Sequence, residues 1–294
     1  MSASNILTGP ARSRPLLTGR QRRFMETALT FLALGVVSVI MLLPLYLMVL
    51  ISVRPADKAF TYPPDLWFTY FTLANYPQAL FELLPFSLFL KNTVIIATAV
   101  IIGEILSCSL VAYGFARFRF PGRDVLFIIL LATLLMPFVV RLVPLFILFQ
   151  KLGWINTFLP LIVPSYFGTP FFIFLMRQFF LTIPPELVDA ARIDGASELG
   201  IWWRIMLPLS KPALAAVAIF AFQNTWNDFL GPLVFLQKAE VRTIILGLYG
   251  LMGMFVEWHL VMAAVVAAVM PLIVVFFIFQ RFFVQGITVS GLKG

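Results

Sequence analysis

The sequence has few of the residues that build catalytic or metal centres. Its 294 residues include one cysteine, Cys108, and one histidine, His259. A single cysteine excludes an intramolecular disulfide, and two isolated side chains give no metal-ligand cluster. We interpret Cys108, inside an apolar run, as a packed core thiol, and His259, beside Trp258, as an interfacial polar residue. The sequence therefore does not point to an enzyme, and no cofactor or metal is expected in this chain.

Charged residues are scarce as well. They make up 12% of the chain, whereas hydrophobic residues make up 61%, and the mean hydropathy is +1.00. These values lie far outside the range of soluble domains and indicate a polytopic membrane protein in contact with lipid. The formal net charge of +8 does not predict a nucleic-acid partner, because the basic residues are spread over short loops.

Apolar runs predict six transmembrane helices and thus an all-α polytopic fold. The runs cover residues 28–51, 91–115, 125–149, 158–175, 213–236 and 259–282, and their lengths suit a hydrocarbon core of ~30 Å. We divide the chain into a disordered basic tail (1–27), a membrane domain (28–286) and a C-terminal tail (287–294). Six spans put both termini on one side. That side carries more than twice as many Lys and Arg residues as the other, which predicts that it is cytoplasmic.

Residues 183–212 are the one long charged segment with strongly apolar sequence on both sides. They predict two short helices joined by a sharp turn. Pro184 and Pro185 suit a helix start, and Asp194-Gly195 is a turn signal. Ser197 suits the N-cap of the second helix.

The first of these helices is predicted to be amphipathic. Apolar side chains at spacings of three and four share one face: Leu187, Ala190 and Ala191. Charged side chains occupy another face: Glu186, Asp189 and Arg192. Because charges cannot be desolvated cheaply in a bilayer, the helix-turn-helix is expected at the membrane surface.

Polar residues inside the spans are candidates for a translocation path, because each must face protein or water rather than lipid. Four of them fall close together in the fifth span, beside Trp226: Gln223, Asn224, Asn227 and Asp228. Amides and carboxylates next to an aromatic ring suit sugar hydroxyls and an apolar sugar face. Such residues also join helices by hydrogen bonds, and both readings stay open.

Arg141 in the third span and Glu104 in the second are further candidates. Their positions along the spans differ by ~8 Å in depth at 1.5 Å per residue, which argues against pairing unless broken helices close the gap. Three readings of Arg141 remain: snorkelling to the outer interface, a salt bridge to Glu104, and attraction of an acidic substrate.

Residues of the helix-turn-helix fall at a familiar spacing: Asp189-Ala190-Ala191, Gly195, Ile205 and Leu207-Pro208. This spacing resembles the EAA loop in permease subunits of bacterial binding-protein-dependent ABC importers. Nearly the whole chain is similar to the carbohydrate-uptake subgroup of that family, through strings such as AYGFARFRFPGR (112–123), LGWINT (152–157), PFFIFLMRQFF (170–180), TWNDFLGPLVFL (225–236) and QRFFVQG (280–286). The chain departs from the family at Asp189, where glutamate is usual, and at Glu104, where an apolar or small residue is usual.

The resemblance implies a heteromeric importer of a mono- or oligosaccharide, or a related polyol, in the bacterial inner membrane. The loop between the fourth and fifth spans would dock on an ATPase subunit through these residues: Glu186, Asp189, Ala190, Ala191, Arg192, Asp194, Gly195, Ile205, Leu207 and Pro208. In the tail, Thr288, Ser290 and Lys293 would form a second ATPase contact. The implied partners are a second permease subunit, two cytoplasmic ATPase subunits and an extracytoplasmic solute-binding protein. ATP and Mg would be bound by the ATPases, because the sequence has no GxxxxGK[ST] loop.

Other interpretations stay open on the sequence alone. In one alternative, the helix-turn-helix serves only to anchor the loop to lipid. In another, the C-terminal tail is a frayed terminus that contacts no partner. A self-contained secondary transporter or channel would require charged coupling sites and repeat symmetry, which are weak or absent in the sequence. An intramembrane enzyme would require a cluster of acids, histidines or nucleophiles.

Overall fold

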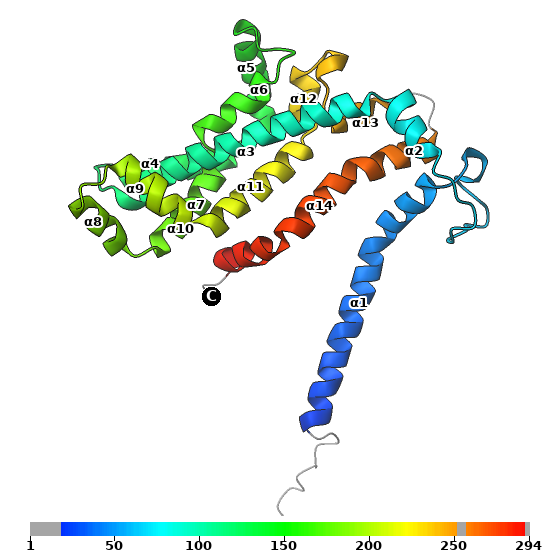
Figure 1. Cartoon of the computed structure of the whole chain (residues 1–294), viewed down its shortest axis with the longest axis horizontal. Coiled ribbons are helices and arrows are strands. Elements are labelled where there is room, and N and C mark those ends of the chain that lie inside the picture. The colour runs from blue at the N-terminus through cyan, green and yellow to red at the C-terminus, as the bar shows by residue number, and fades with distance from the viewer. Residues whose placement is uncertain (1–18, 252–256, 292–294) are drawn as a thin grey trace, which may run out of the picture.

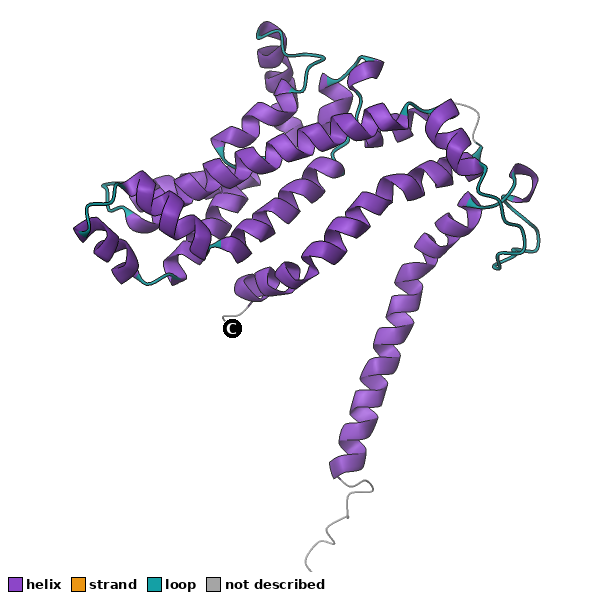
Figure 2. Ribbon diagram, in the orientation of Figure 1, coloured by secondary structure: helices purple, strands orange, loops and turns teal. Residues whose placement is uncertain are grey.

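The computed structural model describes residues 19–251 and 257–291, with side chains between 23 and 280. Every regular element in these ranges is helical (Figures 1 and 2). The longer helices are α1 (Gly19–Ser52), α3 (Phe86–Arg117), α4 (Arg123–Ala132), α5 (Phe138–Lys151), α7 (Pro170–Thr182), α11 (Lys211–Trp226) and α14 (Trp258–Gly291). Short helical segments lie between them: η1 (Ala56–Lys58), α2 (Asn75–Pro77), η2 (Gln78–Leu83), η3 (Thr133–Leu135), α6 (Leu159–Ile162), η4 (Val163–Phe167), α12 (Leu230–Phe235), η6 (Ala239–Val241) and α13 (Ile244–Leu251).

The helices are long and apolar enough for a membrane protein, so the predicted all-α membrane fold is confirmed. Four described segments could each cross a membrane by length and composition: Arg23–Ser52, Phe86–Arg117, Leu159–Thr182 and Trp258–Gln280. Two pairs of helices, each with a bend between its members, raise the number of candidate membrane spans to six if each pair counts as one span. They are Arg123–Leu135 with Phe138–Lys151, bent by 96°, and Glu198–Leu209 with Lys211–Trp226, bent by 82°.

Several predicted boundaries were wrong. Because α1 begins at Gly19, residues 19–27 are helical and the predicted disordered tail is too long. The predicted fifth span, 213–236, is not one helix, since α11 ends at Trp226 and α12 follows after a break. At the other end, α14 continues to Gly291 and includes residues 287–291 of the predicted tail.

The third predicted span, 125–149, contains a sharp bend. Pro137 lies directly before α5 with a ψ of 140°, and Met136 before it has a ψ of 113°, so neither residue is helical. Proline disfavours the α conformation of the residue before it and donates no backbone hydrogen bond, which explains the break at this point. Pro144, by contrast, lies inside α5.

The central helix is α3, which packs against α7, α11 and η4. Gly103 allows the contact with η4, because a Cβ at this position would lie 2.5 Å from Ser165 Oγ and 2.7 Å from the Tyr166 ring. The Ser107 hydroxyl donates to the Ser165 carbonyl at 2.9 Å in the same contact. A glycine and a serine therefore hold α3 close to the segment that precedes α7.

Helix α1 stands apart from the other helices except at its C-terminal end, where it meets α14 (Figure 1). Only 6% of its most hydrophobic window is buried. An exposed apolar helix of this length is soluble only in lipid or against another protein.

Candidate functional site

Residues 183–212 fold into the predicted helix-turn-helix at one end of the molecule (Figure 1). Its first helix, α8 (Pro185–Ile193), follows Pro184. The helix ends where Gly195 takes a φ of +80°, a value that glycine adopts without strain. The N–H of Gly195 donates to the Arg192 carbonyl at 3.0 Å, and that of Ala196 donates to the Ala191 carbonyl at 2.9 Å.

The second half of the helix-turn-helix begins at Ser197, as predicted. Its hydroxyl accepts the N–H of Gly200 at 3.2 Å and caps the next helix. Three short segments then follow one another up to Ser210: α9 (Glu198–Ile201), η5 (Trp202–Met206) and α10 (Leu207–Leu209).

Helix α8 packs against the rest of the protein through two apolar residues. Val188 and Ala191 are buried, with exposed fractions of 1% and 9%, and join a core cluster with Phe180 of α7. Of the three residues predicted to share an apolar face, Ala191 is buried, whereas Leu187 and Ala190 are exposed. Ile193, at the end of α8, is 86% exposed. The helix therefore buries Val188 and Ala191 in the protein and leaves Leu187 and Ile193 exposed.

A network of charges joins the two halves of the turn. The Arg192 guanidinium contacts Asp189 at 3.1 Å and Glu198 at 2.7 and 3.3 Å. The Tyr113 hydroxyl, from α3, donates to the same Glu198 carboxylate at 2.6 Å. The hydrogen bond from Arg192 lowers the pKa of Glu198 below its ordinary value, although partial burial acts in the opposite direction.

Helix α3 makes a second contact with this region through Arg117. Its guanidinium donates to the carbonyls of Phe180 and Ile183 at 2.7 and 2.6 Å. Phe180 lies in the last turn of α7, where its carbonyl also accepts the N–H of Ile183 at 3.2 Å, and Ile183 directly follows the helix. Arg117 and Tyr113 therefore tie the end of α3 to the segment that leads into the helix-turn-helix.

The other predicted contact residues lie on the surface or near it. Glu186, Asp194 and Pro208 are exposed, and Ile205 and Leu207 are half-buried. Sequence reasoning missed Tyr113, Arg117 and Glu198 as parts of this site. The available signal was the string AYGFARFRFPGR, which contains Tyr113 and Arg117 and is similar to a string found in the family.

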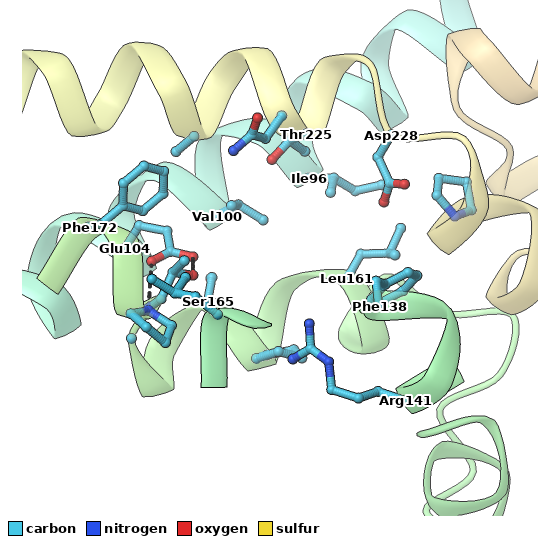
Figure 3. A pocket seen from close by; sticks show the side chains of 18 of the residues that line it. Ile96, Val100, Glu104, Phe138, Arg141, Leu161, Ser165, Phe172, Thr225 and Asp228 are labelled. Atoms are coloured by element: carbon cyan, nitrogen blue, oxygen red, sulfur yellow. Dashed lines mark hydrogen bonds between the residues drawn. The ribbon is translucent and has the colours of Figure 1, made fainter. Parts of the chain in front are cut away.

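A cavity of about 540 Å³ lies among α3, η4, α5 and α11 (Figure 3). Four of the predicted path residues line it: Glu104, Arg141, Asn224 and Asp228. Its wall also holds hydroxyl residues that were not predicted, namely Thr93, Thr133, Ser165, Thr169, Thr225 and Thr243. The helices thus line a half-open cavity with charged, hydroxyl and apolar side chains.

Glu104 is held by donors from two directions. Thr169 donates to it through its hydroxyl at 2.6 Å and through its N–H at 3.3 Å, and the Cys108 thiol donates at 3.0 Å. Glu104 itself is only 5% exposed. Its carboxylate therefore joins α3 to the residue that precedes α7, beside Gly168 with its φ of +85°.

Arg141 lies on the wall of the cavity opposite Thr225 and Asp228 (Figure 3). Its guanidinium carbon is 5.9 Å from the centre of the Phe138 ring, a cation–π distance. Among the described residues no ion pair joins Arg141 to Glu104. Arg141 therefore presents its charge to the cavity rather than to Glu104.

The remaining residues of the predicted polar cluster do not line this cavity. Trp226 is buried, and its indole N–H donates to the Ala268 carbonyl at 3.2 Å, which joins α11 to α14. Asn227 donates to the carbonyl of Gln223 at 2.8 Å and so closes the end of α11. The cluster thus divides into residues that face the cavity and residues that hold helices together.

The predicted C-terminal contacts lie at the limit of the described structure. Thr288 and Ser290 fall within α14, but their side chains are outside the described part of the chain. Lys293 lies wholly outside the described residues. Within the described ranges, His, Cys, Asp and Glu form no group of three that could hold a metal ion.

Apolar helices around a polar cavity, with an amphipathic helix-turn-helix beyond their ends, define the class of a helical membrane permease. The chain belongs to the family described as binding-protein-dependent transport system inner membrane component, which matches residues 104–289. The family comprises inner membrane transport proteins, in agreement with the resemblance in the sequence.

Relatives match over most of the chain. The arabinooligosaccharides transport system permease protein AraQ of Halalkalibacterium halodurans is 36% identical over 261 residues, which cover 88% of this chain and 93% of that protein. The sn-glycerol-3-phosphate transport system permease protein UgpE of Yersinia pestis is 37% identical over 209 residues, or 70% of this chain and 74% of the relative.

A solved structure shares the fold. The match is to the crystal structure of a bacterial ABC transporter involved in the import of the acidic polysaccharide alginate, with a TM-score of 0.78 and 22% sequence identity. It covers 92% of this chain and 100% of that one.

Proposed function

We propose that this chain is a permease subunit of a heteromeric ABC importer for a mono- or oligosaccharide or a related polyol. Support for the solute class comes from similar proteins whose names refer to arabinooligosaccharides and sn-glycerol-3-phosphate. ATP hydrolysis in separate subunits drives the transport, because the sequence of this chain has no phosphate-binding loop. ATP and Mg are therefore bound by those partners, and this subunit is not catalytic.

The observation that carries this proposal is the pair of exposed large apolar side chains on α8. Leu187 and Ile193 are 46% and 86% exposed, whereas Val188 and Ala191 of the same helix are buried and anchor it to the protein. An amphipathic helix with exposed apolar anchors and a charged rim is suited to a groove on another protein. We assign this groove to a cytoplasmic ATPase subunit, with Glu186, Asp189, Arg192 and Asp194 as the rim.

The proposed complex contains two ATPase subunits, a second permease subunit and an extracytoplasmic solute-binding protein. The exposed length of α1 suits lipid and the second permease subunit. Both termini lie in the cytoplasm in this arrangement, and Thr288, Ser290 and Lys293 reach the ATPases. The cavity residues Glu104, Arg141, Asn224 and Asp228 belong to the translocation path, with Gln223 and Asn227 beside it and Trp226 as a support.

Affinity purification of the tagged chain from membranes in a mild detergent tests the proposal. We expect a second permease and a soluble ATPase to copurify, and we expect uptake in proteoliposomes to require ATP and the binding protein. Uptake by the purified chain alone would overturn the proposal and would indicate a secondary transporter or channel.

A further inference from the structure

A turn rich in arginine joins α3 to α4 at the same end of the molecule as the helix-turn-helix (Figure 1). Arg117, the last residue of α3, donates to the carbonyl of Ile183, which leads into the helix-turn-helix. The residues that follow Arg117 surround a hollow of about 420 Å³ on the surface, and we call them the arginine turn: Arg119, Phe120, Gly122, Arg123, Asp124 and Val125.

Positive charge exceeds negative charge around the arginine turn. Arg123 donates through Nε to Asp124 Oδ1 at 2.9 Å and through Nη1 to the Phe118 carbonyl at 3.4 Å. Arg119 is exposed, and no described side chain forms an ion pair with it. Arg177 of α7 adds a third positive charge, close enough to interact with both Arg123 and Asp124. Three guanidinium groups thus lie near one carboxylate, and their surplus charge attracts an anion.

Arg177 is held in place against the inner side of α4. Its guanidinium carbon lies 4.2 Å from the centre of the Phe127 ring, a cation–π distance, and its Nε donates to the Phe115 carbonyl at 3.4 Å. Phe127 is 8% exposed and packs against the rings of Phe115 and Phe174. One side of α4 is therefore anchored to α3 and α7.

The other side of α4 is apolar and open. Four of its residues have exposed fractions between 50% and 65%: Val125, Leu126, Ile128 and Ile129. Helix α4 belongs to the bent pair of 123–135 and 138–151, which is apolar enough to form one membrane span. Its open side is therefore suited to hydrocarbon. A basic cluster at the end of such a surface matches a lipid with a negative headgroup and acyl chains.

We propose that the arginine turn binds an anionic phospholipid, with the phosphodiester at Arg119 and Arg123 and the acyl chains along the open side of α4. A soluble phosphate would use the positive charge but would leave this apolar surface uncovered, so the two features together favour a lipid. The inference rests on the proposed function for its topology, which puts the arginine turn at the cytoplasmic leaflet, where anionic lipids attract basic residues.

Native mass spectrometry of the purified transporter complex in detergent tests the inference. The probes are dioleoylphosphatidylglycerol as the anionic lipid and dioleoylphosphatidylcholine as the neutral one, and we expect the first to bind at least about tenfold more tightly. Arg119→Gln should weaken binding of the anionic lipid by about fivefold, and the double variant with Arg123→Gln by about tenfold or more. Lys151→Gln, which removes an exposed positive charge at the far end of the same bent pair, is the matched control and should leave binding unchanged.

A third variant should change the affinity in the opposite direction. Asp124→Asn removes the carboxylate that competes for Arg123, so it should tighten binding of dioleoylphosphatidylglycerol by about twofold to fivefold. Local damage to the fold would weaken binding instead. The melting temperature of each variant is measured on the same samples, and Arg119→Gln should not change it, because no described side chain pairs with Arg119.

A phosphatidylglycerol with a photoactivatable acyl chain locates the bound lipid. We expect crosslinks to residues 125–129 in the full complex. Crosslinks only at other positions would mean that another protein covers α4, and they would overturn the inference. Equal affinity for the two lipids, unchanged affinity in both arginine variants, and displacement of the lipid by inorganic phosphate would each overturn it as well.

The proposed function is tested separately on the same preparations through copurification of the ATPase. If the ATPase is present and the anionic lipid shows no preference for the arginine turn, only the lipid site is wrong. If the ATPase is absent and the lipid result holds, the proposed function is wrong and the lipid site remains.

Discussion

The Tyr113 hydroxyl donates a hydrogen bond of 2.6 Å to the Glu198 carboxylate, which lies 85 residues further along the chain. The donor is in the last turns of α3, and the acceptor is the first residue of α9. Since Glu198 also holds Arg192 of α8, one carboxylate connects three helices. The proposed docking loop is therefore fixed to a helix that lines the cavity.

Replacing Tyr113 with Phe should loosen this connection without removing the buried ring. A hydrogen bond to a charged group contributes ~1.5–3 kcal/mol, so we expect amide exchange of residues 194–201 to accelerate by about tenfold or more. Hydrogen-exchange mass spectrometry of the complex measures this change. Tyr249→Phe, which removes an exposed hydroxyl elsewhere, is the control. Equal exchange in both variants would contradict a role for the Tyr113 hydroxyl.

The Arg192–Glu198 pair predicts a particular pH dependence. Because the pKa of Glu198 is lowered from 4.5 in the folded protein, its contribution to stability is complete above about pH 4.5 and is lost as the pH falls through the lowered pKa. Exchange of residues 194–201, corrected for its intrinsic pH dependence, should be constant from about pH 8 to pH 6 and rise below about pH 4. In Glu198→Gln the rise in exchange at low pH should disappear. A rise that persists in this variant would come from the titration of another group.

Substituting Gly195 with Asp should uncouple ATP hydrolysis from uptake while the protein remains in the membrane. A Cβ at Gly195 meets no atom within 4 Å, so the cost comes from its φ of +80° and is about 1–2 kcal/mol. Gly153→Asp is a matched control, since Gly153 has a φ of +70° and equally open surroundings. Normal ATP-dependent uptake by Gly195→Asp, measured beside the control, would rule out a coupling role for this turn.

Exposed Ile193 provides a direct test of docking. We expect Ile193→Glu to weaken copurification of the ATPase by about tenfold or more, because burial of one such side chain is worth ~1.5–3 kcal/mol. Leu152→Glu, at an exposed position after α5, should have no effect on this measurement. An unchanged ATPase yield from Ile193→Glu would place the interface elsewhere.

Gly103 and Gly114 of α3 should differ in their tolerance of alanine. A Cβ at Gly103 would press on Ser165 and Tyr166, whereas at Gly114 it meets nothing within 4 Å. Gly103→Ala should destabilise the protein by ~1–3 kcal/mol, visible as a lower melting temperature in detergent. Gly114→Ala should be neutral or slightly stabilising, since alanine favours a helix. Similar melting temperatures would mean that η4 adjusts at little cost.

Local features of the chain were predictable from sequence. The turn at Gly195 and the cap at Ser197 depend on backbone chemistry within a few residues, and both predictions were confirmed. The break of the third span at Pro137 follows from the same kind of rule.

Features that depend on distant contacts were not predictable. Periodicity placed Leu187, Ala190 and Ala191 on one apolar face of α8, but only the fold shows that Ala191 of these packs with Val188 and Phe180 in the core. The bond between Tyr113 and Glu198 joins positions 85 residues apart, so no local pattern reveals it. Likewise, only the folded chain shows that Asp228 faces Arg141 across a cavity while Trp226 is turned to α14.

Helix α3 is continuous from Phe86 to Arg117, so its contacts at the cavity and at the docking loop are joined by one unbroken helix. Glu104 bonds to Thr169 at the cavity, and Tyr113 bonds to Glu198 at the docking loop. Nine residues of helix separate these two attachments by about 13.5 Å. A tilt of about 10° with Glu104 as the fulcrum would displace Tyr113 by about 2 Å, a hinge-scale movement that needs no bending of the helix.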